Sequence, residues 1–116
     1  LRLYQKIDIG LDTFPYNGVT TSFEAIWMNV PILTMKGFNF NSRCGESINK
    51  NIGINYLIAK DEREYIDKAI ELSKDVEKLT SIRNKIFNEL TSSSLFDKDK
   101  FSLEFFRSLE TVYNQL

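Results

Sequence analysis

The hydrophobic positions of the chain follow two spacings in turn, and this alternation predicts strands and helices. Short apolar runs between turn-forming residues are typical of buried strands, whereas apolar residues three and four positions apart are typical of one helical face. The runs predict strands at residues 7–11, 31–35 and 54–58, and the stepped positions predict helices at 21–30, 42–51, 61–73, 75–90 and 101–116. Strands that alternate with helices favour parallel pairing through right-handed crossovers. The sequence therefore predicts an α/β fold with a doubly wound parallel sheet that ends in helices.

The same spacing selects the side chains that we expect in the core. In the helix at residues 21–30 the apolar residues share one face, and they are Phe23, Ile26, Trp27 and Val30. Trp27 is therefore expected in the core and not as a platform for sugar stacking. Cys44 lies on the apolar side of its helix and is expected to be a small buried hydrophobic residue. The later helices are expected to place these residues on their apolar faces: Tyr65, Ile66, Ala69, Ile70 and Leu72, and then Phe105, Leu109, Val112 and Tyr113.

Composition narrows the classes of function. The 116 residues are 42% hydrophobic and 27% charged, which is typical of one globular domain over residues 1–116. A formal charge of -1 provides no basic surface for nucleic acid or an anionic membrane, so we expect neither as a partner. One cysteine and no histidine exclude an internal disulfide, the common zinc-ligand sets and histidine acid–base chemistry from this chain. We therefore expect no metal ion and no other cofactor here.

The sequence contains no predicted membrane span and no secretory signal. No apolar run approaches the roughly 20 residues that span a bilayer, and residues 1–6 carry no secretory signal pattern. A cytoplasmic location is the expectation. The chain begins at Leu1 without an initiator methionine, and Leu3 and Tyr4 already fit a helical face. We therefore expect this chain to be a fragment of a larger protein.

The most informative segment follows the first predicted strand. An Asn17-Gly18 turn leads to Thr20 and Thr21 at the start of a helix, and Glu24 lies one turn further on. In α/β sheets, ligands bind beyond the carboxyl ends of the strands, where a strand passes into a helix. A helix start offers unpaired N–H groups and about half a positive charge. Threonine hydroxyls and these amides suit phosphate oxygens, and Glu24 suits ribose hydroxyls, so the segment predicts a nucleotide diphosphate site.

A purely structural interpretation of the same residues is also open. Thr21 and Glu24 have the spacing of a capping box, in which the two side chains satisfy each other's backbone N–H groups without a ligand. On spacing alone the capping box is slightly favoured. Gly-x-Gly-x-x-Gly and the P-loop pattern do not occur, which argues against dinucleotide and P-loop sites.

A longer resemblance favours the ligand. Residues 11–31 (Leu-Asp-Thr-Phe-Pro-Tyr-Asn-Gly-Val-Thr-Thr-Ser-Phe-Glu-Ala-Ile-Trp-Met-Asn-Val-Pro) resemble the donor-site segment of the O-linked N-acetylglucosamine transferase family, including its SPINDLY-like members. Residues 37–45 resemble that family's Gly-x-x-Phe-x-Ser-Arg-x-Gly loop, and Ser94-Leu95-Phe96-Asp97 with the helix after it resembles the family's closing helix. The resemblance covers almost the whole chain.

The resemblance implies the C-terminal, Rossmann-like lobe of a glycosyltransferase B fold. It implies inverting transfer of a sugar, with N-acetylglucosamine expected, from a UDP-sugar to serine or threonine hydroxyls of an acceptor protein. Thr20 and Thr21 would bind the diphosphate, Glu24 the ribose, and Asn17 and Gly18 would shape the loop. The family's N-terminal lobe, its tetratricopeptide helices, and the histidine and lysine that contact the donor would all precede Leu1. No catalytic acid or base is then expected in this chain.

Val19 departs from the family pattern. Relatives usually have glycine or histidine there, and a valine side chain cannot donate to phosphate, so any contact must use the Val19 N–H. This departure leaves a second interpretation open, a non-catalytic transferase-like domain that serves as a protein-interaction module. Asn29 replaces a usual glycine, and asparagine tolerates the left-handed conformation expected at the helix end.

Overall fold

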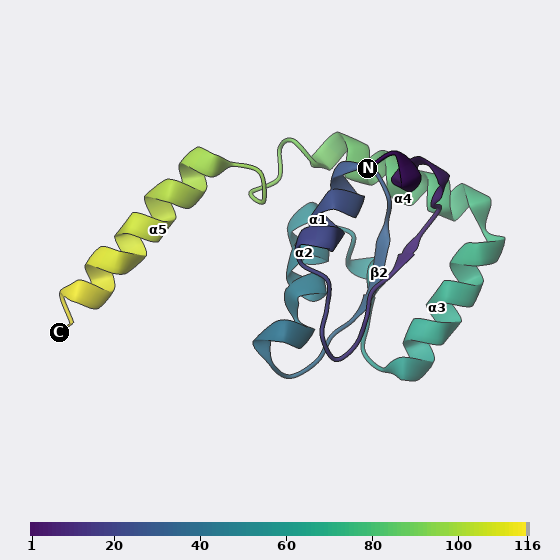
Figure 1. The fold of residues 1–116 in the computed structure, drawn as a ribbon, viewed down its shortest axis with the longest axis horizontal. Coiled ribbons are helices and arrows are strands. Elements are labelled where there is room, and N and C mark those ends of the chain that lie inside the picture. Colours follow the sequence, from purple (N-terminus) through teal and green to yellow (C-terminus); the bar gives the residue numbers. More distant parts are fainter. Residues whose placement is uncertain (116) are drawn as a thin grey trace.

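A three-stranded parallel sheet lies at the centre of the structure, a computed structural model that describes residues 1–115 (Figure 1). The strand order is β1-β2-β3. The strands are β1 (Gly10–Leu11), β2 (Ile32–Met35) and β3 (Ile58–Ala59), and β2 pairs in parallel with both of the others. The predicted α/β fold with a parallel sheet is confirmed.

Helices lie on both sides of the sheet, as expected for a doubly wound arrangement (Figure 1). On one side are α1 (Thr20–Trp27) and α2 (Cys44–Ile52), and on the other is α3 (Glu62–Lys74), against which α4 (Val76–Glu89) packs. The remaining elements are the short 3-10 helices η1 (Arg2–Lys6), η2 (Phe40–Ser42) and η3 (Asn55–Leu57), and the last helix α5 (Lys98–Tyr113).

Aspartates define the starts of the last three helices. The Oδ1 atoms of Asp61, Asp75 and Asp97 accept hydrogen bonds from the backbone N–H three residues further on, at 2.9, 2.8 and 2.9 Å. Each bond satisfies one of the N–H groups that a helix start leaves unpaired. The expected cap at Asp61 is confirmed.

Left-handed residues define two helix ends. Gly53 follows α2 with a φ of 78°, which glycine adopts without steric cost. Asn29 follows α1 with a φ of 61°, as the sequence predicts, and the Nε of Arg83 on α4 donates to the Asn29 carbonyl at 3.1 Å. The turn before β2 is thus held by α4.

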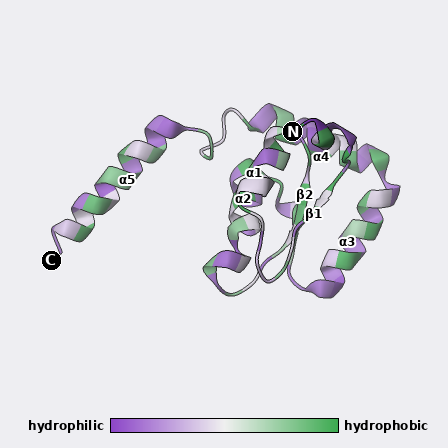
Figure 2. Cartoon of the chain, viewed as in Figure 1, coloured by the Kyte–Doolittle hydropathy of each residue, from purple (hydrophilic) through white to green (hydrophobic). Residues whose placement is uncertain are grey.

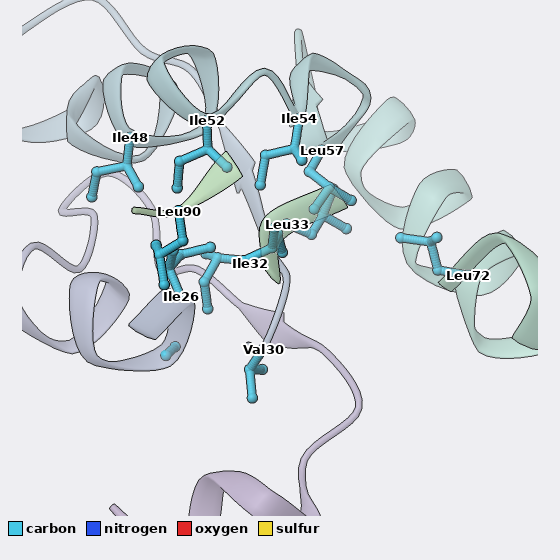
Figure 3. Close-up of a cluster of buried hydrophobic side chains, with 12 residues drawn as sticks. Ile26, Val30, Ile32, Leu33, Ile48, Ile52, Ile54, Leu57, Leu72 and Leu90 are labelled. Atoms are coloured by element: carbon cyan, nitrogen blue, oxygen red, sulfur yellow. The ribbon is translucent and has the colours of Figure 1, made fainter. Parts of the chain in front are cut away.

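One hydrophobic cluster fills the space around the sheet (Figure 3). Ile26 of α1, Leu33 of β2 and Leu72 of α3 are at most 1% exposed, so the cluster joins both helix layers to the central strand. Its members are Ala25, Ile26, Val30, Ile32, Leu33, Ile48, Ile52, Ile54, Leu57, Leu72, Ile86 and Leu90.

Two predicted strands are wrong in their extent. The first pairs only at Gly10–Leu11, because the preceding Ile7 carbonyl accepts a hydrogen bond from Nη2 of Arg83 at 3.1 Å and not from a neighbouring strand. The third begins only at Ile58, because the Leu57 N–H bonds to the Ile54 carbonyl, three residues back, and closes the 3-10 turn η3.

Several expected core residues are not buried. Trp27 is 55% exposed, because α1 turns Ser22, Ala25 and Ile26 toward the sheet, and the indole instead contacts the Phe96 ring with centroids 5.3 Å apart. The expectation that Trp27 is a core residue is therefore wrong. Ile66 and Ile70 are each 49% exposed, because α3 buries only Leu72 fully. Cys44 is half-buried, not fully buried.

Helix α5 projects away from the rest of the chain and packs against none of the sheet (Figure 1). It has no buried residue, although apolar and polar residues both recur along it (Figure 2). The side chains that the sequence placed on one apolar side are all exposed: Phe105, Leu109, Val112 and Tyr113. Within residues 1–115, no helix has both the length and the apolar character to cross a membrane.

Candidate functional site

The segment singled out from the sequence lies where β1 passes into α1, at the carboxyl edge of the sheet. A loop at residues 12–19 joins the two elements, and Val19 is the N-cap residue with φ -116° and ψ -77°. Within residues 1–115, no side chain makes a cap hydrogen bond to the start of α1. The first backbone N–H groups of the helix are therefore left without a side-chain acceptor.

The capping-box interpretation is wrong in this structure. Thr21 is already the second helical residue, so its hydroxyl is not in the N-cap position, and α1 has no side-chain cap hydrogen bond. Within the described residues, the backbone N–H groups of Thr20, Thr21 and Ser22 have no hydrogen-bond acceptor. Three adjacent unpaired N–H groups at the positive end of a helix dipole form an arrangement that suits an anion.

The predicted site residues differ in their exposure to solvent. Val19, Thr20, Thr21 and Glu24 are exposed along the start of α1, and Val19 is 41% exposed. Asn17 is only 1% exposed. Their roles as ligands stay predictions, but the structure does bring all four exposed residues to one end of one helix.

Asn17 is used entirely within the protein. Its Nδ2 donates to the Thr13 carbonyl at 2.8 Å, and its Oδ1 accepts from the Gly45 N–H at 3.4 Å. Its own N–H donates to the Asn41 carbonyl at 3.0 Å. Asn17 thus ties the loop to the segment that leads into α2, and its part in shaping the loop for a ligand stays a prediction.

Two further residues lie beside the candidate site, although the spacing of residues in the sequence did not predict them there. The Tyr4 hydroxyl of η1 lies 3.5 Å from Oε2 of Glu24 and 3.4 Å from the Thr21 carbonyl, so it neighbours the predicted ribose contact. Asp12 accepts hydrogen bonds from Gly18 and Thr34. Burial raises the pKa of the Asp12 carboxyl, although these hydrogen bonds act in the opposite direction.

Two hollows flank the start of α1. The smaller has a volume of about 200 Å³ and is lined by Tyr4, Leu11, Asp12, Thr13, Gly18, Thr21, Ser22, Ala25 and Ile32. The larger, about 660 Å³, is a groove along the outer sides of α1 and α2, and its lining includes Val19, Phe23, Phe38, Phe40, Cys44 and Leu95. Ligand sites usually occupy about 300–1,000 Å³, so the smaller hollow alone would hold only part of a nucleotide.

Comparison with known proteins decides the family. The sequence profile described as glycosyl transferase family 41 matches residues 1–105. The chain belongs to glycosyl transferase family 41. The resemblance drawn from residues 11–31 and 37–45 is thereby confirmed.

Named relatives align along most or all of the chain. The protein named Probable UDP-N-acetylglucosamine–peptide N-acetylglucosaminyltransferase SPINDLY of Solanum lycopersicum is 37% identical over 116 residues, which are 100% of this chain and 12% of that protein. The UDP-N-acetylglucosamine–peptide N-acetylglucosaminyltransferase of Caenorhabditis elegans is 35% identical over 101 residues, which are 87% of this chain and 9% of that protein. The chain thus spans about an eighth of the first of these relatives.

A solved structure shares the fold of this chain. A mutant of the Thermobaculum terrenum O-GlcNAc transferase superposes with a TM-score of 0.81 at 36% sequence identity, over 98% of this chain and 21% of that chain. The fold is that of the C-terminal, Rossmann-like lobe of a glycosyltransferase B fold, as the resemblance implied. Among residues 1–115, no three His, Cys, Asp or Glu side chains gather where they could hold a metal ion.

A buried carboxylate lies in the first turn of α2, close to the candidate site. Glu46 is 4% exposed, and its Oε1 accepts from Nζ of Lys50 at 2.7 Å while its Oε2 accepts from Nε of Arg43 at 3.0 Å. The hydrogen bond from Lys50 holds the pKa of Glu46 below its ordinary value of 4.5; burial acts in the opposite direction, and the hydrogen bond from Arg43 lowers the pKa further. The ionised form is therefore favoured by folding.

Glu46→Gln is expected to lower the free energy of unfolding by about 1 kcal/mol at pH 7, because both cations are more than half exposed and water screens them. A lowered carboxyl pKa contributes stability above 4.5, and this contribution is lost as the pH falls through the lowered value. Urea unfolding at several pH values measures the effect. The two proteins should converge in stability at acid pH, and a difference that stays constant with pH would contradict the assignment.

Proposed function

We propose that this chain supplies the diphosphate- and ribose-binding part of a transferase that moves a sugar, N-acetylglucosamine in the first instance, from a UDP-sugar to serine or threonine hydroxyls of proteins. The observation that carries the proposal is the uncapped start of α1, with three unpaired N–H groups at Thr20, Thr21 and Ser22. The names of the family 41 relatives in Solanum lycopersicum and Caenorhabditis elegans support the choice of donor and acceptor.

The diphosphate would lie against the helix start. The N–H groups of Thr20, Thr21 and Ser22 and the exposed threonine hydroxyls are all donors, and phosphate oxygens are acceptors. The Val19 side chain offers no donor, so at that position only its N–H can contribute. Glu24 lies one turn further along α1 and is exposed, where its carboxylate can accept from ribose hydroxyls.

The chemistry that this arrangement supports is electrostatic. Negative charge builds on the departing diphosphate as the bond to the sugar breaks, and donors that are already oriented stabilise that charge without rearrangement. Removing one such donor from an enzyme typically lowers the rate about 10²- to 10³-fold. We propose direct, inverting displacement: the acceptor oxygen forms the new bond to the sugar, the bond to the diphosphate breaks so that UDP leaves, and the hydroxyl proton passes to a group outside this chain or to solvent. No acid, base, metal ion or other cofactor would be supplied by this chain.

The remainder of the site would come from outside residues 1–116. We propose an N-terminal lobe of the same chain as the partner that completes the donor site and binds the acceptor protein, and the cytoplasm as the compartment. The isolated chain is expected to bind UDP only weakly, with a Kd in the millimolar range, which corresponds to a binding free energy of about 4 kcal/mol, because it would supply only part of the site.

The full-length protein tests the proposal. It should bind UDP in calorimetry, and with a UDP-sugar it should release UDP and add the mass of one sugar to serine or threonine residues of an acceptor protein. A folded full-length protein that has no measurable affinity for UDP would contradict the proposal and favour the interaction module. Binding without transfer would keep the site and reject the activity.

A further inference from the structure

The Asp12 carboxylate connects the loop before α1 to the neighbouring strand. Its Oδ1 accepts from the Gly18 N–H at 2.7 Å and from the Thr13 N–H at 3.0 Å, and its Oδ2 accepts from the Thr34 hydroxyl of β2 at 2.7 Å. Both oxygens are therefore occupied by donors of the protein. Asp12 is the first residue after β1, and Gly18 immediately precedes the N-cap residue of α1.

Two more elements close around Asp12. A Cβ atom placed on Gly45 would lie 2.5 Å from Oδ2 of Asp12 and 2.2 Å from Oγ1 of Thr34, so only glycine fits there and the first turn of α2 lies directly against the carboxylate. That turn is the positive end of the α2 dipole, which favours a negative charge. On the other side, the Tyr65 hydroxyl of α3 donates to the Asp12 carbonyl at 2.8 Å. Residue 12 is thus held by β2, α2 and α3 together.

We propose that Asp12 is a positioning residue for the donor site, which acts through Gly18. By accepting the Gly18 N–H, Asp12 fixes the end of the loop at residues 13–18 and so directs the N–H groups of the first turn of α1 away from the protein. Both carboxylate oxygens already have donors, and a negative charge would repel a diphosphate, so Asp12 has no part in direct contact with the ligand. The inference rests on the proposed function, because it takes the diphosphate as the ligand of these N–H groups.

Two substitutions at position 12 in the full-length protein separate positioning from direct contact. In Asp12→Asn the amide oxygen can still accept from Gly18 and Thr13, and the amide NH₂ can donate to the Thr34 hydroxyl, which also accepts. We expect a Kd for UDP within about threefold of the wild-type value, since the loop is kept. Asp12→Ala removes the acceptor, and we expect the Kd to rise at least about tenfold. Asp67→Asn, a change to an exposed carboxylate of α3, is the matched control and should leave the Kd unchanged.

Calorimetry measures the Kd of each protein for UDP. Hydrogen exchange without nucleotide measures how firmly the N–H groups of the loop are held. Faster exchange of the Gly18 and Thr13 N–H groups in Asp12→Ala, with wild-type exchange in Asp12→Asn, is the expected pattern. An Asp12→Asn protein that binds UDP about tenfold more weakly would overturn the inference, and so would an Asp12→Ala protein that is folded and binds normally. If Asp12→Ala does not fold, the result for Asp12→Asn still decides. If the wild-type protein does not bind UDP, the proposed function fails, whereas the exchange pattern still reports on the loop.

Discussion

Glu24→Ala in the full-length protein is expected to raise the Kd for UDP about 10- to 100-fold, because a charged hydrogen bond to the ribose contributes about 1.5–3 kcal/mol. The side chain is exposed one turn into α1, and its one side-chain hydrogen bond within the described residues is with the Tyr4 hydroxyl at 3.5 Å. Stability should therefore change little. Calorimetry with UDP and thermal unfolding of both proteins measure the two effects.

The control for this substitution is Glu89→Ala. Glu89 is an exposed glutamate near the end of α4, away from the start of α1, so its replacement should leave UDP affinity unchanged. A capping glutamate would behave in the opposite way to Glu24, since its loss would cost about 1 kcal/mol of stability and no affinity. Unchanged UDP affinity in Glu24→Ala would remove Glu24 from the site.

Leu33→Ala is expected to lower the free energy of unfolding by about 2–5 kcal/mol, which is a large part of the roughly 5–15 kcal/mol available to a domain. Leu33 lies in the central strand β2, is 0% exposed, and belongs to the cluster shared by both helix layers (Figure 3). Truncation leaves a cavity that the surrounding strands and helices cannot close.

Urea unfolding measures the loss at Leu33, and Leu103→Ala provides the comparison. Leu103 is the same residue type at 52% exposure on α5, where truncation should change stability by less than about 0.5 kcal/mol. An equal loss of unfolding free energy in Leu33→Ala and Leu103→Ala would contradict the burial of Leu33 in the core.

The sequence predicts best where local chemistry decides the structure. The strand at Ile32–Met35 and the aspartate cap at Asp61 were both predictable, because a short apolar run after a proline and a capping carboxylate act on their own neighbours. The left-handed Asn29 was predictable for the same reason. In each case the determining contacts lie within a few residues.

Prediction from the sequence fails where residues far apart in the chain determine which side chains are buried and where a strand begins. Trp27 has the spacing of a core residue, yet how α1 is rotated on the sheet leaves the indole at the edge beside Phe96. The strand expected from Ile54 loses its first residues to a 3-10 turn, and only the pairing with β2 shows where it begins. The apolar residues of α5 predict a packed helix, but no residue of α5 is buried in this chain.

The candidate site shows the same division. Thr20, Thr21 and Glu24 were found from their place at a helix start, but spacing alone could not distinguish a ligand site from a capping box. That choice depends on where the helix begins, and Val19, not a threonine, is the N-cap residue. Asp12 and Tyr4 were missed because their contacts with Thr34 and Glu24 join residues 22 and 20 positions apart.

Hydrogen exchange of the full-length protein with and without UDP shows whether the start of α1 binds the diphosphate of UDP. Unpaired N–H groups exchange rapidly, so binding should slow exchange most at Thr20, Thr21 and Ser22 and much less along α3 and α4. Protection centred on any other segment of residues 1–115, or no protection at concentrations of UDP that saturate the protein, would contradict diphosphate binding at the start of α1.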